Sequence, residues 1–131
     1  MYSVCNPEIN TTNLGEGLKI CDPNEWSSSY NGSGTRAQEF EEFNGRLYLG
    51  TAGGAGDGDV YVCAPIINTT GDKTICDADE WIKTFEGAQE FVASLKSYNG
   101  KLYAGEGLDI GDGNVYVCEP SKNTTGDKTI C

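Results

Sequence analysis

The chain consists largely of one sequence written twice. Residues 22–76 and 77–131 align without a gap at a period of 55 residues. The copies close on "VCAPIINTTGDKTIC" and "VCEPSKNTTGDKTIC", and residues 1–21 match only the end of a copy, with three extra residues in the loop. Repeat periods of this size are typical of arrays, solenoids or propellers. We therefore expect a repeat tail at 1–21, followed by one β repeat at 22–76 and another at 77–131.

The local signals inside each repeat favour short strands. "EWIKTF" and "EFVASLKSY" are apolar runs rich in aromatic and β-branched residues, and Asn99-Gly100 separates the second run from "KLYAG". An Asn-Gly pair between apolar runs is the strongest short-range hairpin signal, because both residues accept the positive φ of a type I′ turn. Gly111-Asp112-Gly113 then turns the chain into "NVYVC". The pattern predicts four antiparallel strands per repeat and no helix.

Two stretches carry a family resemblance. "EFEEFNGRLYLGTA…GDGDVYVC" and "SLKSYNGKLYAGEG…GDGNVYVC" resemble the inner strands of kelch-like and Asp-box-like β-propeller blades. The resemblance implies an all-β fold of tandem four-stranded antiparallel propeller-like blades. The Cys-bounded loop after each Val-Tyr-Val strand is an insertion relative to such blades, and we expect it to be a disulfide-stapled outer loop. Propellers close with about four to eight blades. Two repeats and a tail therefore imply a ring completed by several chains, a piece of a longer array, or an open assembly.

The six cysteines predict disulfides formed in an oxidising compartment. Their regular spacings of 16, 13 and 13 residues differ from the closely spaced pairs of a zinc site. Local pairing is the simplest of the fifteen possible connectivities, and every repeat could make it by itself. We therefore expect Cys5–Cys21, Cys63–Cys76 and Cys118–Cys131, with cross-repeat or intermolecular pairing as the alternative. Each staple would support a repeat that has little core of its own.

The same loops carry N-glycosylation sequons at Asn10, Asn68 and Asn123, and Asn31 begins a fourth. Asn, Thr and Gly-Asp also form turns without a glycan. A sequon on a protruding, disulfide-closed loop nevertheless favours N-linked glycans on at least one of these residues.

Two further groups of residues are candidate binding sites. The acidic turns could place oxygen ligands around calcium, although they lack the EF-hand spacing and are better interpreted as hairpin turns; the candidates are Asp57, Asp59, Asp109, Asp112 and Asn114. Trp26 and Trp81, with four tyrosines, could stack on sugar rings, but aromatic residues at equal spacing in both repeats favour packing between sheets. The tyrosines are Tyr48, Tyr61, Tyr103 and Tyr116.

Charge and composition narrow the function classes. The net charge of −11 disfavours nucleic acid and anionic membrane surfaces as partners, and no stretch is long enough to span a membrane. The absence of histidine excludes a His-based nucleophile pair or metal site. No pair of the twenty acidic residues stands out as a glycosidase pair, so we expect neither an enzyme nor a required cofactor. The start "MYSVCNPEIN" lacks the apolar stretch of a signal peptide, which suggests a mature or partial product.

These observations predict an extracellular or cell-surface, disulfide-stapled and glycosylated β-repeat protein with a structural or self-assembly role. The alternative is a lectin-like propeller assembled from several chains, and a calcium-stabilised piece of a longer ectodomain or enzyme is a third possibility. "YSVC" at residues 2–5 corresponds to the final strand of a repeat whose other strands are missing. Because a lone strand has unpaired edges, we expect it to pair with a neighbouring copy, in a homo-oligomer or, preferably, an open filament.

Overall fold

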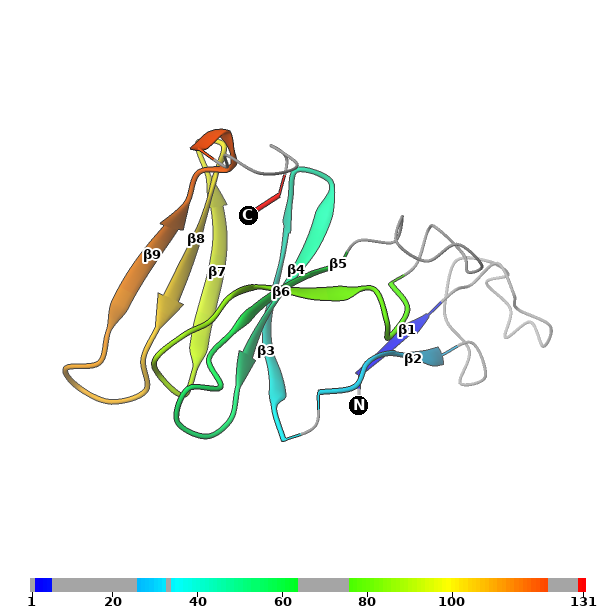
Figure 1. Cartoon of the computed structure of the whole chain (residues 1–131), viewed down its shortest axis with the longest axis horizontal. Helices are drawn as coiled ribbons and strands as arrows, with labels where there is room; N and C mark the ends of the chain where they lie inside the picture. Colours follow the sequence, from blue (N-terminus) through cyan, green and yellow to red (C-terminus); the bar gives the residue numbers. More distant parts are fainter. Residues whose placement is uncertain (1, 6–25, 33, 64–75, 123–129) are drawn as a thin grey trace, which may run out of the picture. The chain divides into compact units, whose positions relative to one another are not determined.

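The computed structural model describes residues 2–5, 26–32, 34–63, 76–122 and 130–131 (Figure 1). Two compact units are present: residues 1–31 with 65–81, and residues 32–64 with 82–131. In the first unit, β1 (Tyr2–Cys5) pairs antiparallel with β2 (Trp26–Tyr30). The N-terminal strand was expected to pair with a neighbouring molecule, and that expectation is wrong for this edge: its partner is the strand that opens the first repeat of its own chain.

The second unit contains two antiparallel sheets, which we call sheet B and sheet C. Sheet B has the order β3 (Arg36–Phe43), β4 (Arg46–Ala52), β5 (Val60–Cys63), β6 (Trp81–Phe85). Sheet C has the order β7 (Val92–Tyr98), β8 (Lys101–Glu106), β9 (Asn114–Cys118). A short 3₁₀ helix, η4 (Pro120–Lys122), follows β9. The all-β prediction is confirmed.

The two Asn-Gly hairpins form as expected. Asn44 and Asn99 have φ values of 51° and 50°, and Gly45 and Gly100 have 71° and 70°. Asparagine tolerates this left-handed region better than most residues do, and glycine adopts it without a Cβ penalty. The turns set the register of β3 on β4 and of β7 on β8.

The sheets do not follow the boundaries of the sequence repeats. β6 was expected to open the second repeat as the first strand of its own sheet, but it lies at the edge of sheet B beside β5. Among the described residues, sheet C therefore has three strands, and no strand pairs with the outer edge of β9. The expected pair of equal four-stranded blades is replaced by sheets of two, four and three strands. The N-terminus shows the same arrangement: β2, the first strand of its repeat, pairs with β1, the last strand of the preceding repeat, as β6 lies beside β5.

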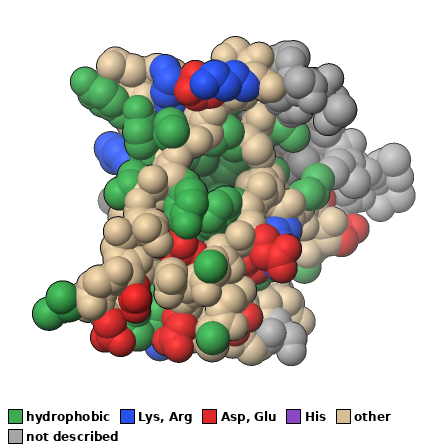
Figure 2. Space-filling view, turned by 60° about the vertical axis from the view of Figure 1, so that its left-hand side comes forward, with side chains coloured by type: hydrophobic (Ala, Val, Ile, Leu, Met, Phe, Trp, Pro, Cys, Tyr) green, Lys and Arg blue, Asp and Glu red, His purple; other side chains and the backbone are tan. Residues whose placement is uncertain are grey.

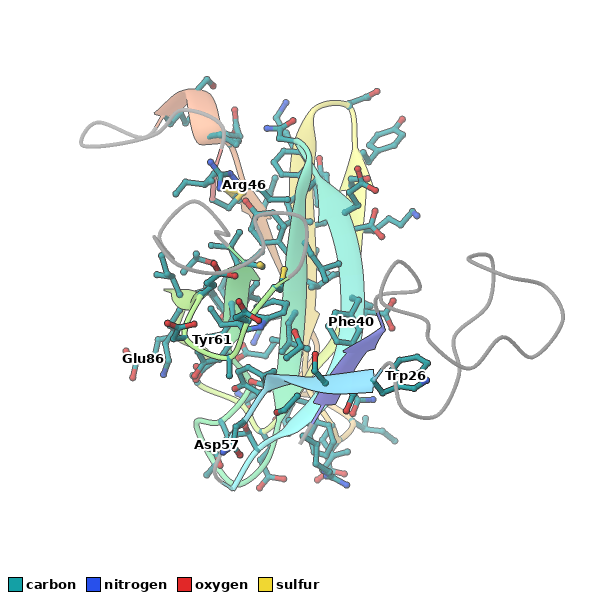
Figure 3. All side chains as sticks on the ribbon, turned by 90° about the vertical axis from the view of Figure 1, so that its right-hand side faces the viewer. Trp26, Phe40, Arg46, Asp57, Tyr61 and Glu86 are labelled. Atoms are coloured by element: carbon teal, nitrogen blue, oxygen red, sulfur yellow. A yellow bond between two sulfur atoms is a disulfide. The ribbon has the colours of Figure 1, made fainter. Side chains whose placement is uncertain are left out.

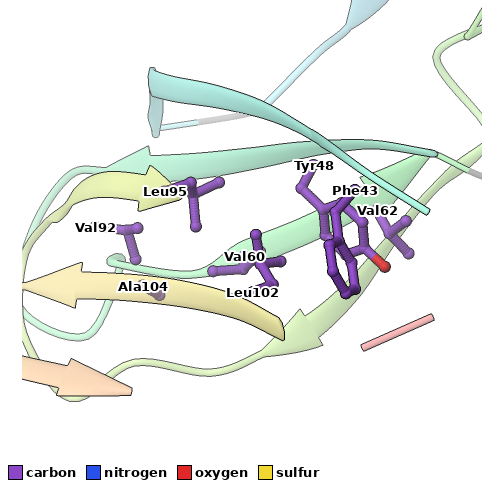
Figure 4. Packing of buried hydrophobic residues seen from close by; sticks show 8 residues of the cluster. All are labelled: Phe43, Tyr48, Val60, Val62, Val92, Leu95, Leu102 and Ala104. Atoms are coloured by element: carbon purple, nitrogen blue, oxygen red, sulfur yellow. The ribbon is translucent and has the colours of Figure 1, made fainter. Parts of the chain in front are cut away.

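The core lies between sheets B and C (Figure 4). Strand residues alternate between the two faces of a sheet, so one row of side chains from each sheet meets the other. The buried cluster consists of Phe43, Tyr48, Val60, Val62, Val92, Leu95, Leu102 and Ala104. Gly50 permits this approach: a Cβ at that position would lie 2.7 Å from Cγ1 of Val92.

Candidate functional site

The described disulfide of the last loop connects the end of β9 to the core. Cys118 and Cys131 are joined, and the backbone N–H of Cys131 donates to the Tyr48 hydroxyl at 3.0 Å. Both cysteines pack against the buried cluster. Local pairing is thus what the structure shows for this loop, and disulfides are typical of an oxidising compartment. Cys63 and Cys76 are also disulfide-bonded. Cys21 lies outside the described residues, and Cys5 ends β1.

Most of the predicted glycosylation sites lie outside the described residues: Asn10, Asn68 and Asn123. Asn31 is described, and it is exposed directly after β2. Its position leaves room for a glycan, although Ser33 of the same sequon is not described.

In the first acidic turn, the candidate calcium ligands bind other parts of the protein. The Asp57 carboxylate accepts from the Gly54 N–H at 2.6 Å, and the Asp57 carbonyl accepts from the Thr51 hydroxyl at 2.8 Å. Asp59 is buried, accepts from the Gly87 N–H at 3.2 Å, and forms an ion pair with Lys83 at 2.7 Å. The hydrogen bond to Asp59 raises the pKa of Lys83 above its ordinary value. These contacts close a hairpin and join it to the segment after β6.

In the second acidic turn, the contacts are of the same kind. The Asp112 N–H donates to the Asp109 carbonyl at 3.1 Å, and the Asn114 amide donates to the Asp112 carbonyl at 3.4 Å. Within the described part of the chain, no group of three or more acidic or cysteine side chains lies close enough to hold a metal ion. The hydrogen bonds within both acidic turns match the hairpin interpretation.

Two buried glutamates were not identified from the sequence. One Glu106 oxygen accepts from the Gln89 N–H at 2.9 Å, whereas Oε2 has no hydrogen-bond partner among the described residues. Loss of solvent, reinforced by the nearby charge of Glu106, raises the pKa of Tyr116. In the other unit, Glu80 is fully buried and accepts from the Asp77 N–H at 2.8 Å. The recurring D-x-x-E spacing, which resembles a capping box, could have indicated Glu80. Glu106 had no such signal, because Thr51 occupies its place in the first repeat.

The two tryptophans have different environments. The indole N–H of Trp81 donates to the Ser29 carbonyl at 2.9 Å, and its ring meets Tyr30 edge-on at 5.9 Å. Trp81 is therefore held by the protein itself, as a packing residue would be. Trp26 is 52% exposed. The described structure thus does not show one equally exposed tryptophan in each repeat.

A small apolar cavity of about 130 Å³ opens between sheets B and C beside the Cys118–Cys131 disulfide. Its lining includes Phe85, Leu95, Leu102 and Tyr116, and the rings of Phe85 and Tyr116 are 4.8 Å apart. Figure 2 shows hydrophobic side chains gathered around a hollow on the side of the molecule that carries β9. Ligand pockets are usually larger, at about 300–1,000 Å³, and contain several convergent polar groups. The cavity is smaller than that and is lined mainly by apolar side chains.

Several exposed apolar residues lie on the outer surface of sheet C, which we call the open face. Its register aligns Lys96, Tyr103 and Val117 in one row and Gly105 with Val115 in the next. Tyr98 extends the row of aromatic residues, with its ring 6.5 Å from Tyr103. Val115 and Tyr98 are 74% and 65% exposed. Exposed apolar side chains therefore gather on this face of the sheet.

The surface of sheet B that points away from sheet C, which we call the far face, also carries apolar residues. Cross-strand register places Phe40, Leu49 and Tyr61 in one row and Glu42 beside Leu47 in the next. Figure 3 shows Phe40 on β3 and Tyr61 on β5 on the side of the sheet that faces the viewer. Phe40 and Leu47 are exposed, whereas Leu49, between Phe40 and Tyr61, is fully buried.

Comparison with protein-family models, with curated proteins and with solved structures finds no match. None of the helices in the described ranges is long and apolar enough to cross a membrane. The class defined by the fold is that of a disulfide-bonded, antiparallel all-β protein.

Proposed function

We propose that this chain is an extracellular structural protein that associates with copies of itself and whose sheets are propeller-like blades. The observation that carries the proposal is the open face of sheet C, where Tyr98, Val115 and Val117 are exposed on the same side of the sheet. Burying such a face against another protein removes apolar surface from water and favours association. The disulfide of Cys118 and Cys131 supports the extracellular part of the proposal, because such bonds persist in oxidising compartments.

The turn and loop chemistry agrees with a structural role. The acidic side chains of the first turn bind backbone groups and Lys83, and so hold strands in place. The proposal includes N-linked glycans on the loops and on exposed Asn31, where they would limit contacts to the faces of the sheets. We propose no enzymatic activity and no required cofactor.

A carbohydrate-binding role is the second candidate, and the exposure of Trp26 is the observation that favours it. Exposed aromatic rings can pack against the apolar faces of sugars. Against it stands Trp81, whose N–H and ring are already engaged by Ser29 and Tyr30. A glycan array tests this role. If the parent protein binds a glycan on the array and the W26A variant does not, the lectin-like role is favoured.

Light scattering and electron microscopy of the intact oxidised chain test the proposal. We expect concentration-dependent growth in particle mass, and more growth at high salt, because counter-ions screen the net charge of −11. A particle that remains a monomer up to millimolar concentration at every ionic strength would contradict the proposed function. Intact mass before and after deglycosylation tests the glycans on the same material.

A further inference from the structure

The internal repeat makes two surfaces of this protein equivalent. A shift of 55 residues converts the face of sheet B that is covered by sheet C into the open face of sheet C. The covered residues Glu41, Phe43, Tyr48, Gly50, Val60 and Val62 correspond to Lys96, Tyr98, Tyr103, Gly105, Val115 and Val117. The strand register is conserved as well: Glu41, Tyr48 and Val62 lie opposite one another, and so do Lys96, Tyr103 and Val117.

The environments of these equivalent residues are opposite. Val60 and Val62 are 3% and 0% exposed, whereas Val115 and Val117 are 74% and 50% exposed. The difference arises because sheet C covers Val60 and Val62, whereas no described sheet covers Val115 and Val117. The open face of sheet C is thus the equivalent of a face that, in sheet B, packs against the inner side of sheet C.

The far face of sheet B has the matching relation to the inner side of sheet C. Leu95 and Leu102, which pack against sheet B, are 3% and 4% exposed. Their equivalents Phe40 and Leu47 are 45% and 36% exposed, whereas Leu49, the equivalent of the core residue Ala104, is 0% exposed. The chain thus presents on its surface the open face of sheet C and the part of the far face of sheet B that contains Phe40 and Leu47.

We propose that a second copy of this chain places the far face of its sheet B on the open face of sheet C. At Phe40 and Leu47, the contact would repeat between molecules the packing seen at Leu95 and Leu102 between sheets B and C. It joins two different surfaces, so it is heterologous and continues from molecule to molecule as a ring or a filament. The inference rests on the proposed self-association and assigns the surface that performs it.

Charge complementarity at one position supports this arrangement. Between sheets B and C, Glu41 accepts from the Ser97 N–H at 2.9 Å and from its hydroxyl at 2.7 Å. In the intermolecular contact, Lys96 takes the place of Glu41, and Glu42 of the second copy takes the place of Ser97. An acid–hydroxyl contact is thus replaced by a contact between opposite charges. The Lys96 side chain is 77% exposed, although its ammonium lies 3.7 Å from the Glu41 carboxylate of its own chain, and Glu42 is exposed.

Charge reversal tests the pairing of these two faces. K96E places like charges in the contact, and so does E42K, so each variant alone should associate at least tenfold more weakly than the parent, which corresponds to about 1.4 kcal/mol. An equimolar mixture of K96E and E42K should recover association, because every contact between the two variants then joins an acid to a base. Recovery in the mixture is specific to a contact that joins two different faces. Sedimentation velocity across a concentration series measures both effects.

K122E is a matched control for K96E, because it makes the same change in net charge in η4, outside both sheets, and its side chain is exposed. This control should associate like the parent protein. V117D should abolish association at concentrations where the parent assembles, because it would bury an unpaired charge. Circular dichroism on every variant checks that the fold is retained.

Each remaining outcome is decisive. One outcome is that the parent protein assembles while K96E, E42K and V117D are folded and associate as strongly as the parent does. That result overturns this inference and leaves the proposed self-association in place. Parent protein that stays monomeric overturns both. Native material with an intact mass larger than this chain, and with no self-association, would assign the open face to a further repeat and also overturn the second-copy contact.

Discussion

At the scale of single residues, the charged side chains of this protein hold secondary structure together. Asp59 joins the turn between β4 and β5 to Lys83 of β6, and Glu106 accepts a backbone N–H of the segment before β7. Glu41 connects the two sheets of the second unit through Ser97. Predicting Asp59 as a turn residue was possible because glycine precedes it in the sequence. The partners of Glu41 and Glu106 lie 56 and 17 residues away, so only the packing of the strands reveals them.

The hydrogen bonds from Ser97 lower the pKa of Glu41, with a smaller effect from Lys96. Because the folded-state pKa lies below the ordinary value of 4.5, the bond contributes fully above that value. The contribution is lost as pH falls through the folded-state pKa. E41Q should therefore reduce the free energy of unfolding by about 1 kcal/mol at pH 7 and by much less near pH 3. Urea unfolding at both pH values measures this difference.

E42Q is the control for that comparison, since it removes a negative charge from an exposed neighbour on the same strand. It should change the free energy of unfolding by less than about 0.5 kcal/mol at either pH. An E41Q effect that is the same at pH 7 and pH 3 would show that the carboxylate charge is not responsible.

At the scale of strands and turns, local sequence predicted the elements well and their partners less well. The Asn-Gly hairpins, the strand before each of them and the Val-Tyr-Val strands all form in the second unit. Local signals are sufficient there because a turn of fixed geometry sets the register of two adjacent strands. The assignment of β6 to the preceding sheet depends on which edge is available, and an alternating pattern does not encode that.

Gly50 and Gly105 occupy equivalent positions in β4 and β8, so alanine at each position compares a covered face with an open one. At Gly50 the new Cβ would lie 2.7 Å from Cγ1 and 3.3 Å from the carbonyl oxygen of Val92. The two sheets would have to move apart, and we expect G50A to lower the free energy of unfolding by about 1–3 kcal/mol.

G105A should cost much less, because its close contact is the Ser94 hydroxyl, which can rotate away. Thermal unfolding of both variants measures the contrast. Equal destabilisation by the two substitutions would contradict the asymmetry between the covered and the open face.

At the scale of the whole molecule, the disulfide and the sheet packing depend on each other. Cys131 lies beside Tyr48 in the core because it is joined to Cys118 at the end of β9. The recurring cysteine spacing predicted a local staple. That the staple also reaches the core was not predictable, since it requires β9 and Tyr48 to belong to sheets that face each other.

Replacing both Cys118 and Cys131 by serine should lower the free energy of unfolding by about 3 kcal/mol, as expected for a closed loop of this length. Guanidinium unfolding measures the loss. Y48F isolates the hydrogen bond to Cys131 and should cost about 1 kcal/mol. An unchanged unfolding midpoint in the double serine variant, or a non-reducing peptide map that pairs either cysteine elsewhere, would refute the local staple.

Patterns in the linear sequence were sufficient to predict the all-β class, the short strands, the Asn-Gly turns and the presence of disulfides. Each of these depends on interactions between residues close together in the chain or on a recurring spacing. Packing in three dimensions selected which sheet receives β6, the pairing of β1 with β2, and which of two equivalent valine rows is buried. Val60 and Val115 occur in nearly identical sequence, and their different environments arise only because sheet C covers sheet B and no described sheet covers the open face of sheet C.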